Sequence, residues 1–231
     1  MKIMLADDQE LIRESLKVIL SMQEDMEVLG VCPDGQALLD RLADLAARGE
    51  ALPDCLLLDI RMPGIDGVEV TRRVKALYPE VRILMLTTFD DDEYVYKALQ
   101  FGASGYLLKG VSVEELTSAV RRVVEGGTIV NPELLDKVMR LFRQMTRGSA
   151  REELLIPVNA AGGNALTKTE RQIAQLVGRG LSNKEIAAKL HFSEGTIRNG
   201  LSAALAKLEL RDRTQLAIWA VQTGLAKETL P

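Results

Sequence analysis

The first half of the chain alternates short apolar runs with segments whose apolar residues recur at helical spacing. The apolar runs are four or five residues long and lack the regular polar alternation of a strand with one exposed face. Such runs are typical of strands buried on both faces of a parallel sheet. Five pairs of this kind within residues 1–126 predict an α/β domain with a doubly wound, five-stranded parallel sheet. The strands are expected at 2–6, 27–31, 55–58, 82–86 and 105–108, and the helices at 9–21, 35–48, 68–77, 91–101 and 113–125.

The second half shows helical periodicity only. A Gly-Gly pair at 126–127 closes the α/β part, and an Asn-Pro pair at 131–132 predicts the start of a basic helix over about 132–147. Residues 148–164 carry Gly and Pro without a clear period, so we interpret them as a linker. We therefore expect an α/β domain at 1–126, a connecting helix and linker at 127–164, and an all-α four-helix domain at 165–231.

The two halves differ in charge. Residues 1–126 hold 14 Lys and Arg against 23 Asp and Glu, a net charge of −9, whereas residues 127–231 hold 15 against 10, a net charge of +5. The basic half favours contact with a polyanion. No apolar run approaches the roughly 18 residues of a membrane helix, and the N-terminus lacks a signal-peptide pattern. We therefore expect a cytoplasmic protein with no membrane partner.

Cys32 and Cys55 lie in apolar, strand-like contexts. We interpret them as reduced core residues, not as a disulfide or a metal site. Because the sequence has a single histidine, a histidine-based metal site or catalytic triad is also disfavoured.

Acidic side chains follow two of the predicted strands. Asp7 and Asp8 come after the first strand, and Asp59 comes after the third. Ligands of open α/β sheets bind beyond the carboxyl ends of the strands, so these acids are expected to gather there. Their mutual repulsion calls for a cation, and hard oxygen ligands suit Mg²⁺. An aspartate beside Mg²⁺ can attack a phosphoryl group and form an acyl phosphate, which makes Asp59 the candidate phosphoacceptor.

Polar side chains also mark the fourth and fifth predicted strands. Thr87 ends the fourth strand, where its hydroxyl would donate a hydrogen bond to a phosphoryl oxygen, and Lys109 ends the fifth, where its ammonium would pair with another. Tyr106 lies three residues before Lys109 in the same strand. Each residue alone has an ordinary structural interpretation, such as a helix cap or a solvated charge. Together at one sheet edge they predict a site that accepts a phosphoryl group.

The order and spacing of these residues resemble the receiver domain of two-component response regulators. The resemblance covers residues 1 to about 125. It is carried by Asp7-Asp8, by LLLDIRMPGIDG at 56–67, by Thr87-Thr88 and by GYLLK at 105–109.

This resemblance implies a flavodoxin-like fold and phosphotransfer from a histidine kinase to Asp59. Thr87 and Tyr106 would be the switch pair, in which the phosphate recruits the hydroxyl and the ring turns inward behind it. The surface around the fourth and fifth helices would then repack. Mg²⁺ would be held by Asp8, Asp59, the backbone carbonyl of Arg61 and, directly or through water, Asp7.

The basic end of the chain has the pattern of a helix-turn-helix. Ser182 is positioned to cap one short helix, with Glu185 at the capping-box distance, and Ser193 caps the next. A tight turn at 191–192 joins the two helices. The four helices of this region are expected at 168–177, 183–190, 194–208 and 213–223.

The helix predicted at 194–208 has two distinct faces. Its apolar residues are expected to pack on the neighbouring helices: Ile197, Leu201, Leu205 and Leu208. Its opposite face is available to a major groove, where Arg can read guanine and Asn adenine, while nearby basic residues contact phosphates. The predicted DNA-binding residues are Lys184, Thr196, Arg198, Asn199, Ser202, Lys207, Arg211 and Arg213, with Ala203 in the groove-facing set and Thr214 near a phosphate.

The stretch from Leu166, LTKTERQIAQLVGRGLSNKEIAAKLHFSEGTIRNGLSAALAKLEL, resembles the LuxR-type DNA-binding domain. With the receiver, the chain resembles the NarL/LuxR subfamily of response regulators. The resemblance implies a histidine kinase and double-stranded promoter DNA as partners, and a homodimer on phosphorylation in which the helix at 213–223 resembles the dimerising element.

The chain departs from this pattern at Gly200, where histidine is common, and at Ser202 and Ala203, which are often polar or basic. A mid-helix glycine costs roughly 1 kcal/mol relative to alanine. Fewer charges also release fewer counterions. We therefore expect a single DNA-binding domain to bind weakly, with a shallow salt dependence, and to need dimerisation.

These features predict a phosphorylation-gated transcription regulator, not an enzyme. An aspartyl-phosphate phosphatase would carry a second acid two residues after its nucleophile, where this chain has Arg61. A constitutive regulator is disfavoured because every expected phosphorylation residue is present. A flavin-binding module is disfavoured because the loops lack a Ser/Thr/Gly-rich phosphate cradle and flanking aromatic residues.

Overall fold

The computed structural model of the chain describes residues 1–87, 92–129 and 165–227. The chain divides into two compact units, Met1–Val124 and Glu125–Pro231. The predicted helix at 132–147 and the linker at 148–164 lie outside the described residues. None of the helices within the described ranges combines the length and the apolar character needed to cross a bilayer.

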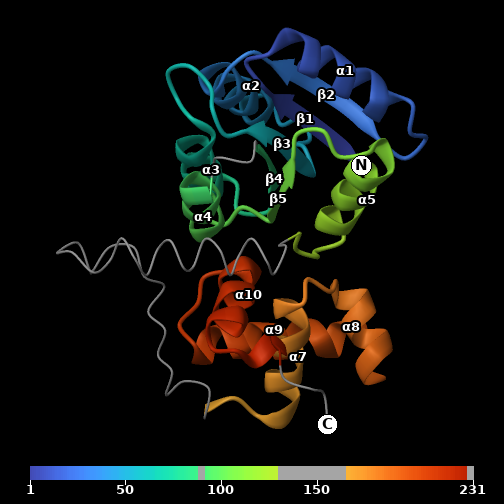
Figure 1. Cartoon of the computed structure of the whole chain (residues 1–231), viewed down its shortest axis with the longest axis vertical. Helices are drawn as coiled ribbons and strands as arrows, with labels where there is room; N and C mark the ends of the chain where they lie inside the picture. The colour runs from blue at the N-terminus through green and yellow to red at the C-terminus, as the bar shows by residue number, and fades with distance from the viewer. Residues whose placement is uncertain (88–91, 130–164, 228–231) are drawn as a thin grey trace, which may run out of the picture. The chain divides into compact units, whose positions relative to one another are not determined.

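The first unit is built on one five-stranded parallel sheet (Figure 1). The strand order is β2-β1-β3-β4-β5, so the winding direction reverses at β1 and β3, the place where such sheets bind ligands. The predicted doubly wound α/β class is therefore confirmed. The strands are β1 (Lys2–Ala6), β2 (Glu27–Cys32), β3 (Cys55–Asp59), β4 (Arg82–Thr87) and β5 (Gly105–Leu108).

Helices cover both faces of this sheet. Figure 1 shows α1 and α5 on one face and α2, α3 and α4 on the other. β3 is buried along its whole length, as its apolar sequence predicts, because it lies between two other strands and two helical layers. The helices are α1 (Glu10–Ser21), α2 (Gly35–Ala47), α3 (Gly67–Leu77), α4 (Asp92–Gln100) and α5 (Val113–Val124).

The second unit is all-α in its described part, which confirms the predicted class. The third helix, α9, packs against both α7 and α8, and α10 packs against α7. Its core includes Ile173, Leu176, Ile197, Leu216 and Trp219. The elements are α7 (Lys168–Gly178), α8 (Asn183–Leu190), α9 (Glu194–Lys207), α10 (Arg213–Gln222) and a short 3₁₀ turn, η2 (Leu225–Lys227).

Side-chain caps define the helix-turn-helix. Ser182 accepts a hydrogen bond from the backbone of Glu185, whose carboxylate bonds back to Ser182, so the predicted capping box is confirmed. The predicted Ser193 cap is also present, on the backbone of Thr196. Between the two helices His191 has φ of 58°, a left-handed conformation that turns the chain sharply.

The predicted apolar face of α9 is only partly right. Ile197 and Leu208 are buried as expected, whereas Leu201 and Leu205 are partly exposed. Ala204 is buried instead. Gly200 supplies a reason for the shift, because a Cβ there would stand 2.5 Å from Cδ1 of Ile173 in α7. The two helices therefore approach closely along the glycine side of α9, which turns the leucines toward solvent.

Candidate functional site

Lys109 lies between two aspartates at the carboxyl edge of the sheet. Its Nζ is 2.8 Å from Oδ2 of Asp59 and 2.9 Å from Oδ2 of Asp7. Both carboxylates are buried, with Asp7 fully covered and Asp59 4% exposed. Three side chains from three separate strand ends thus meet at one point, as the order of elements in the sequence predicts.

Asp8 completes an acidic cluster with Asp7 and Asp59. One ligand atom from each residue lies within 4.8 Å of the others, and Asp8 itself is exposed. Oxygens bound to one Mg²⁺ at about 2.1 Å lie at most about 4.2 Å apart, so a small closure would let all three reach the same ion. The donor set, three carboxylates with one side open to water, therefore fits Mg²⁺.

Burial and ion pairing oppose each other in this cluster. Burial raises the pKa of Asp59, and the charge of Asp7 adds to the rise, although Lys109 offsets part of it. Burial likewise disfavours the Lys109 ammonium, but its contacts with Asp59 and Asp7 outweigh burial and raise its pKa. A cation is therefore favoured beside Asp59, and Lys109 supplies one.

Thr87 and Tyr106 lie on the adjoining strands. Thr87 is 1% exposed, and its carbonyl accepts a hydrogen bond from the Lys109 backbone at 2.7 Å. In the sheet register Asp59 pairs with Leu86, the residue before Thr87. Tyr106 is 6% exposed and pairs with Met85. The structure thus brings Thr87 to the strand end beside Asp59 and buries Tyr106 in the neighbouring strand.

The loop after Asp59 returns to pack on the strand that it leaves. Gly67 donates a backbone hydrogen bond to Ile60 at 2.9 Å. A Cβ on Gly67 would stand 2.2 Å from the carbonyl oxygen of Asp59, so no side chain fits there without backbone movement. Sequence reasoning missed this role, although an Asp-Gly pair before a helical period is its signal.

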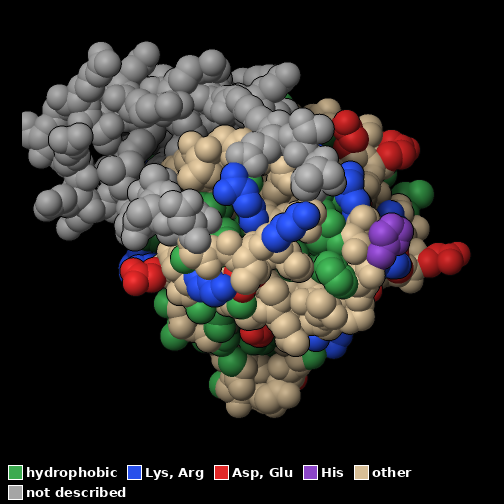
Figure 2. Space-filling view, turned by 90° about the horizontal axis from the view of Figure 1, so that it is seen from below, with side chains coloured by type: hydrophobic (Ala, Val, Ile, Leu, Met, Phe, Trp, Pro, Cys, Tyr) green, Lys and Arg blue, Asp and Glu red, His purple; other side chains and the backbone are tan. Residues whose placement is uncertain are grey.

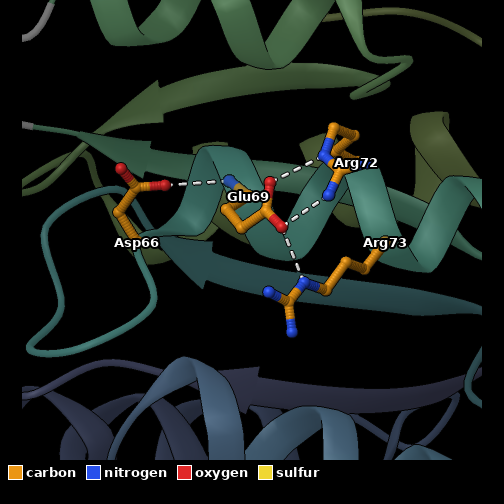
Figure 3. A network of polar contacts seen from close by, with 4 residues as sticks. All are labelled: Asp66, Glu69, Arg72 and Arg73. Carbon is orange, nitrogen blue, oxygen red and sulfur yellow. Dashed lines mark hydrogen bonds and ion pairs between the residues drawn. The ribbon is translucent and has the colours of Figure 1, made fainter.

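A polar network fixes the start of α3 (Figure 3). The side chain of Asp66 caps the helix by accepting from the backbone of Glu69 at 2.8 Å. The Glu69 carboxylate in turn accepts from Arg72 and Arg73, each at 2.7 Å. These hydrogen bonds lower the pKa of Glu69 to about 2, and the bond from Arg72 has the larger effect. The Asp66 cap therefore fixes where the loop after Asp59 ends and α3 begins, whereas the Glu69 ion pairs lie within α3. The sequence analysis predicted neither.

Arg61 lies in this loop, two residues after Asp59, and is exposed. Its Cζ is 5.8 Å from the ring centroid of Tyr94 in α4, and Nζ of Lys97 is 6.0 Å from the same centroid. Two cations thus share the ring of Tyr94.

The helix-turn-helix presents most of its predicted DNA-binding side chains to solvent. Figure 2 shows Lys and Arg side chains on a face of the molecule that also carries a histidine. Ala203 is partly exposed. The exposed members are Lys184, Thr196, Arg198, Asn199, Ser202, Lys207 and Arg211.

Three of the predicted phosphate contacts show burial or protein partners that the sequence did not predict. Thr214 is 4% exposed, so its prediction as a surface contact was wrong: it belongs to the buried first turn of α10. Nζ of Lys207 pairs with Glu170 of α7 at 2.7 Å. Arg213 is partly buried and donates to Oδ1 of Asn183 at 2.7 Å and to the carbonyl of Leu181. Lys207 and Arg213 therefore tie helices together.

Glu170 has a second structural role that the sequence analysis did not predict. With Thr167 it forms a capping box at the start of α7. Its carboxylate therefore serves both the α7 backbone and the end of α9. The spacing Thr-x-x-Glu before an apolar run is the signal that would have revealed the cap.

Comparison with known families and proteins covers both units. Residues 3–121 match the model described as response regulator receiver domain. Residues 164–220 match the model described as bacterial regulatory proteins, luxR family.

Curated proteins match over nearly the whole chain. The transcriptional regulatory protein LnrK of Bacillus subtilis is 39% identical over 227 residues, which is 97% of this chain and 98% of that protein. The response regulator protein VraR of Staphylococcus epidermidis is 35% identical over 224 residues, again 97% and 98%. Among solved structures, RcsB of Salmonella typhimurium has a TM-score of 0.52 at 23% identity and covers 94% of this chain and 96% of its own.

Proposed function

The chain belongs to the two-component response regulators that join a receiver domain to a LuxR-family DNA-binding domain, and from this we propose that phosphorylation of Asp59 controls its binding to DNA. As a member of that family it is a DNA-binding transcription regulator. The phosphoacceptor, the metal, the partners and the residues named below are our proposal.

The observation that carries the proposal is the convergence of Lys109 on Asp59 beside two further carboxylates. A histidine kinase would present a phosphohistidine to this edge of the sheet. An oxygen of Asp59 would then bond to phosphorus as the phosphorus–nitrogen bond of the donor breaks. Lys109 would pair with the phosphoryl oxygens, and Thr87 would donate its hydroxyl to one of them.

The acidic cluster would hold Mg²⁺. Bound there, the ion neutralises charge on the phosphoryl group during transfer. Asp8, Asp59 and the backbone carbonyl of Arg61 are the proposed direct ligands, with Asp7 bound directly or through water. Asp7 is also ordered by its own loop, because its Oδ1 accepts from the backbone of Gln9 at 2.9 Å.

Phosphorylation would act as a two-state switch. The phosphoryl group is a covalent ligand that favours one of two packings, and Thr87 with Tyr106 is the proposed pair that senses it. A change from about 1% to about 99% active needs roughly 5.5 kcal/mol of differential stabilisation. One hydroxyl bond and one ion pair supply part of that, and homodimer formation supplies the remainder.

DNA recognition would use the exposed face of α9. We propose that Arg198, Asn199 and Ser202 face base edges, with Thr196 nearby, and that Lys184 and Arg211 contact phosphates. Lys207 and Arg213 are proposed to act mainly by positioning the helices. The same fold is used by RcsB, which has been solved in complex with DNA. We place the receiver at 1–126, the connecting segment at 127–164 and the DNA-binding domain at 165–231.

The test uses the full-length chain and its Asp59→Asn variant. Radiolabelled acetyl phosphate with Mg²⁺ should label the wild type and not the variant, because the amide cannot form the acyl phosphate. Beryllofluoride, which mimics the phosphoryl group, should raise the molar mass seen by light scattering toward that of a dimer and strengthen a footprint on genomic DNA fragments. Persistent labelling of Asp59→Asn would show a different acceptor and overturn the proposal.

A further inference from the structure

His191 ends α8 in a conformation that glycine adopts more easily. Its φ is 58° and its ψ is 40°, a left-handed region that costs free energy for a residue with a Cβ. The turn uses only the backbone here, because the bond that closes it runs from the Phe192 N–H to the carbonyl of Ala187, at 3.0 Å. Glycine most often fills such a position, so the histidine calls for a reason outside the turn.

The imidazole of His191 is available to a partner outside the protein. The residue is exposed, and within residues 1–87, 92–129 and 165–227 its side chain has no hydrogen bond or ion pair. The next residue, Phe192, is 44% exposed. A left-handed backbone and two exposed rings at one turn all run against local preference, and such departures are expected at functional sites.

The turn lies between two helices that meet DNA in different ways. In a helix-turn-helix the first helix crosses the phosphate backbone, and the first residues of the second helix contact base edges in the major groove. His191 follows α8 and precedes Ser193, the cap of α9, by two residues. A side chain at this point would therefore lie beside the backbone at the edge of the groove. Figure 2 shows the histidine on a face that also carries Lys and Arg side chains.

We propose that the His191 imidazole donates a hydrogen bond to a DNA phosphate and so fixes how the start of α9 enters the major groove. A histidine ring carries an N–H donor in both its neutral and its charged form. Phosphate contacts set register and orientation without reading sequence. The inference rests on the proposed function, because it takes α9 as the helix that reads DNA.

Two substitutions in the full-length chain separate the imidazole from the backbone. His191→Gly removes the ring and relieves the left-handed strain, so the variant should unfold at the same temperature as the wild type or at a higher one. His191→Ala removes the same ring but keeps a Cβ, so it should unfold at a lower temperature than the glycine variant. Both should bind DNA about three- to tenfold more weakly in fluorescence anisotropy, the loss of one hydrogen bond. The loss should be equal on a fragment that the wild type protects in footprinting and on an unrelated duplex.

Glu209→Gly is the matched control. Among the described residues Glu209 is the other one that has a Cβ and a positive φ, at 55°, and it lies beyond the far end of α9. Its glycine variant relieves the same strain and adds the same chain freedom, yet it should bind DNA no more weakly than the wild type.

Three results would overturn the inference. His191→Gly could bind as tightly as the wild type, Glu209→Gly could lose as much affinity, or the loss could be confined to the protected fragment, which would indicate a base contact. A wild type that protects no fragment would instead overturn the proposed DNA recognition, so the two failures are distinguishable.

Discussion

Gly67 is the first residue of α3, and a Cβ added there would stand 2.2 Å from the carbonyl oxygen of Asp59 and 2.9 Å from Cε of Met85. Met85 can shift its flexible end, whereas the Asp59 backbone is held in β3. We expect Gly67→Ala to lower the free energy of unfolding by about 1–3 kcal/mol, as overpacking does. It should also displace Asp59 and weaken beryllofluoride binding, measured by titration.

Gly30→Ala is the control for that substitution. The atoms nearest its Cβ would belong to the side chain of Met4, at 3.6 Å, which is ordinary contact. The variant should therefore retain beryllofluoride affinity. Equal beryllofluoride affinity of the two variants would show that the close approach at Gly67 does not determine the position of Asp59.

The two cysteines give a separate prediction. Cys55 is fully buried and Cys32 is 5% exposed, and burial raises their pKa values to about 12 and about 11. Only the thiolate reacts with disulfide reagents. Below pH 9 both thiols should resist Ellman's reagent in the folded chain and react fully in guanidinium chloride. Rapid labelling of the folded chain would contradict the buried positions.

Among the helices, α7 and α9 are joined by the ion pair of Glu170 with Lys207. Because Lys207 has a protein partner, Lys207→Met should cost up to about 1 kcal/mol of stability and leave the salt dependence of DNA binding unchanged. Lys184→Met should instead reduce the slope of log K against log salt by about 0.9, the loss of one phosphate contact. Binding titrations at several salt concentrations measure this slope. A smaller slope for Lys207→Met than for the wild type would show that Lys207 contacts a DNA phosphate.

Secondary structure followed closely from sequence pattern in this chain. Each described strand and α-helix ends within one residue of its predicted boundary, because apolar runs and capping residues mark these ends locally. The burial of individual side chains was harder to predict: Leu201 and Leu205 are partly exposed, and Thr214 is buried. It depends on how near α9 approaches α7 and on which face of α10 is covered, and both are set by residues distant in sequence.

In the proposed phosphorylation site, too, some residues could be predicted from the sequence and others could not. Asp7, Asp8, Asp59 and Lys109 could be predicted together because parallel strands place their carboxyl ends at one edge. Contacts between side chains of different elements could not be predicted in this way. Sequence periodicity does not show that Arg61 meets Tyr94, or that Lys207 meets Glu170. Arg213 shows the same limit: its charge suggested a phosphate contact, and the sequence gave no sign that its side chain donates to Leu181 and Asn183.

At the scale of the whole molecule, the chain divides into two compact units with separate cores. The proposed phosphorylation residues all lie in the first unit, and the helix-turn-helix lies in the second. Each core is built from its own helices and strands, so each unit is expected to unfold as its own cooperative transition. Differential scanning calorimetry of the full-length chain should therefore resolve two transitions.

Ligand binding then identifies which transition belongs to which unit. Mg²⁺ with beryllofluoride at about 100 times the dissociation constant should stabilise the first unit by about 2.7 kcal/mol, because the ligand binds only the folded form. That transition should rise by several degrees while the other stays in place. Asp59→Asn should abolish the shift because it removes the acceptor oxygen, and Lys184→Met should leave it intact. A single transition that moves as a whole would mean that the two units unfold as one, and that the proposed phosphorylation signal would reach the DNA-binding helices through a shared core.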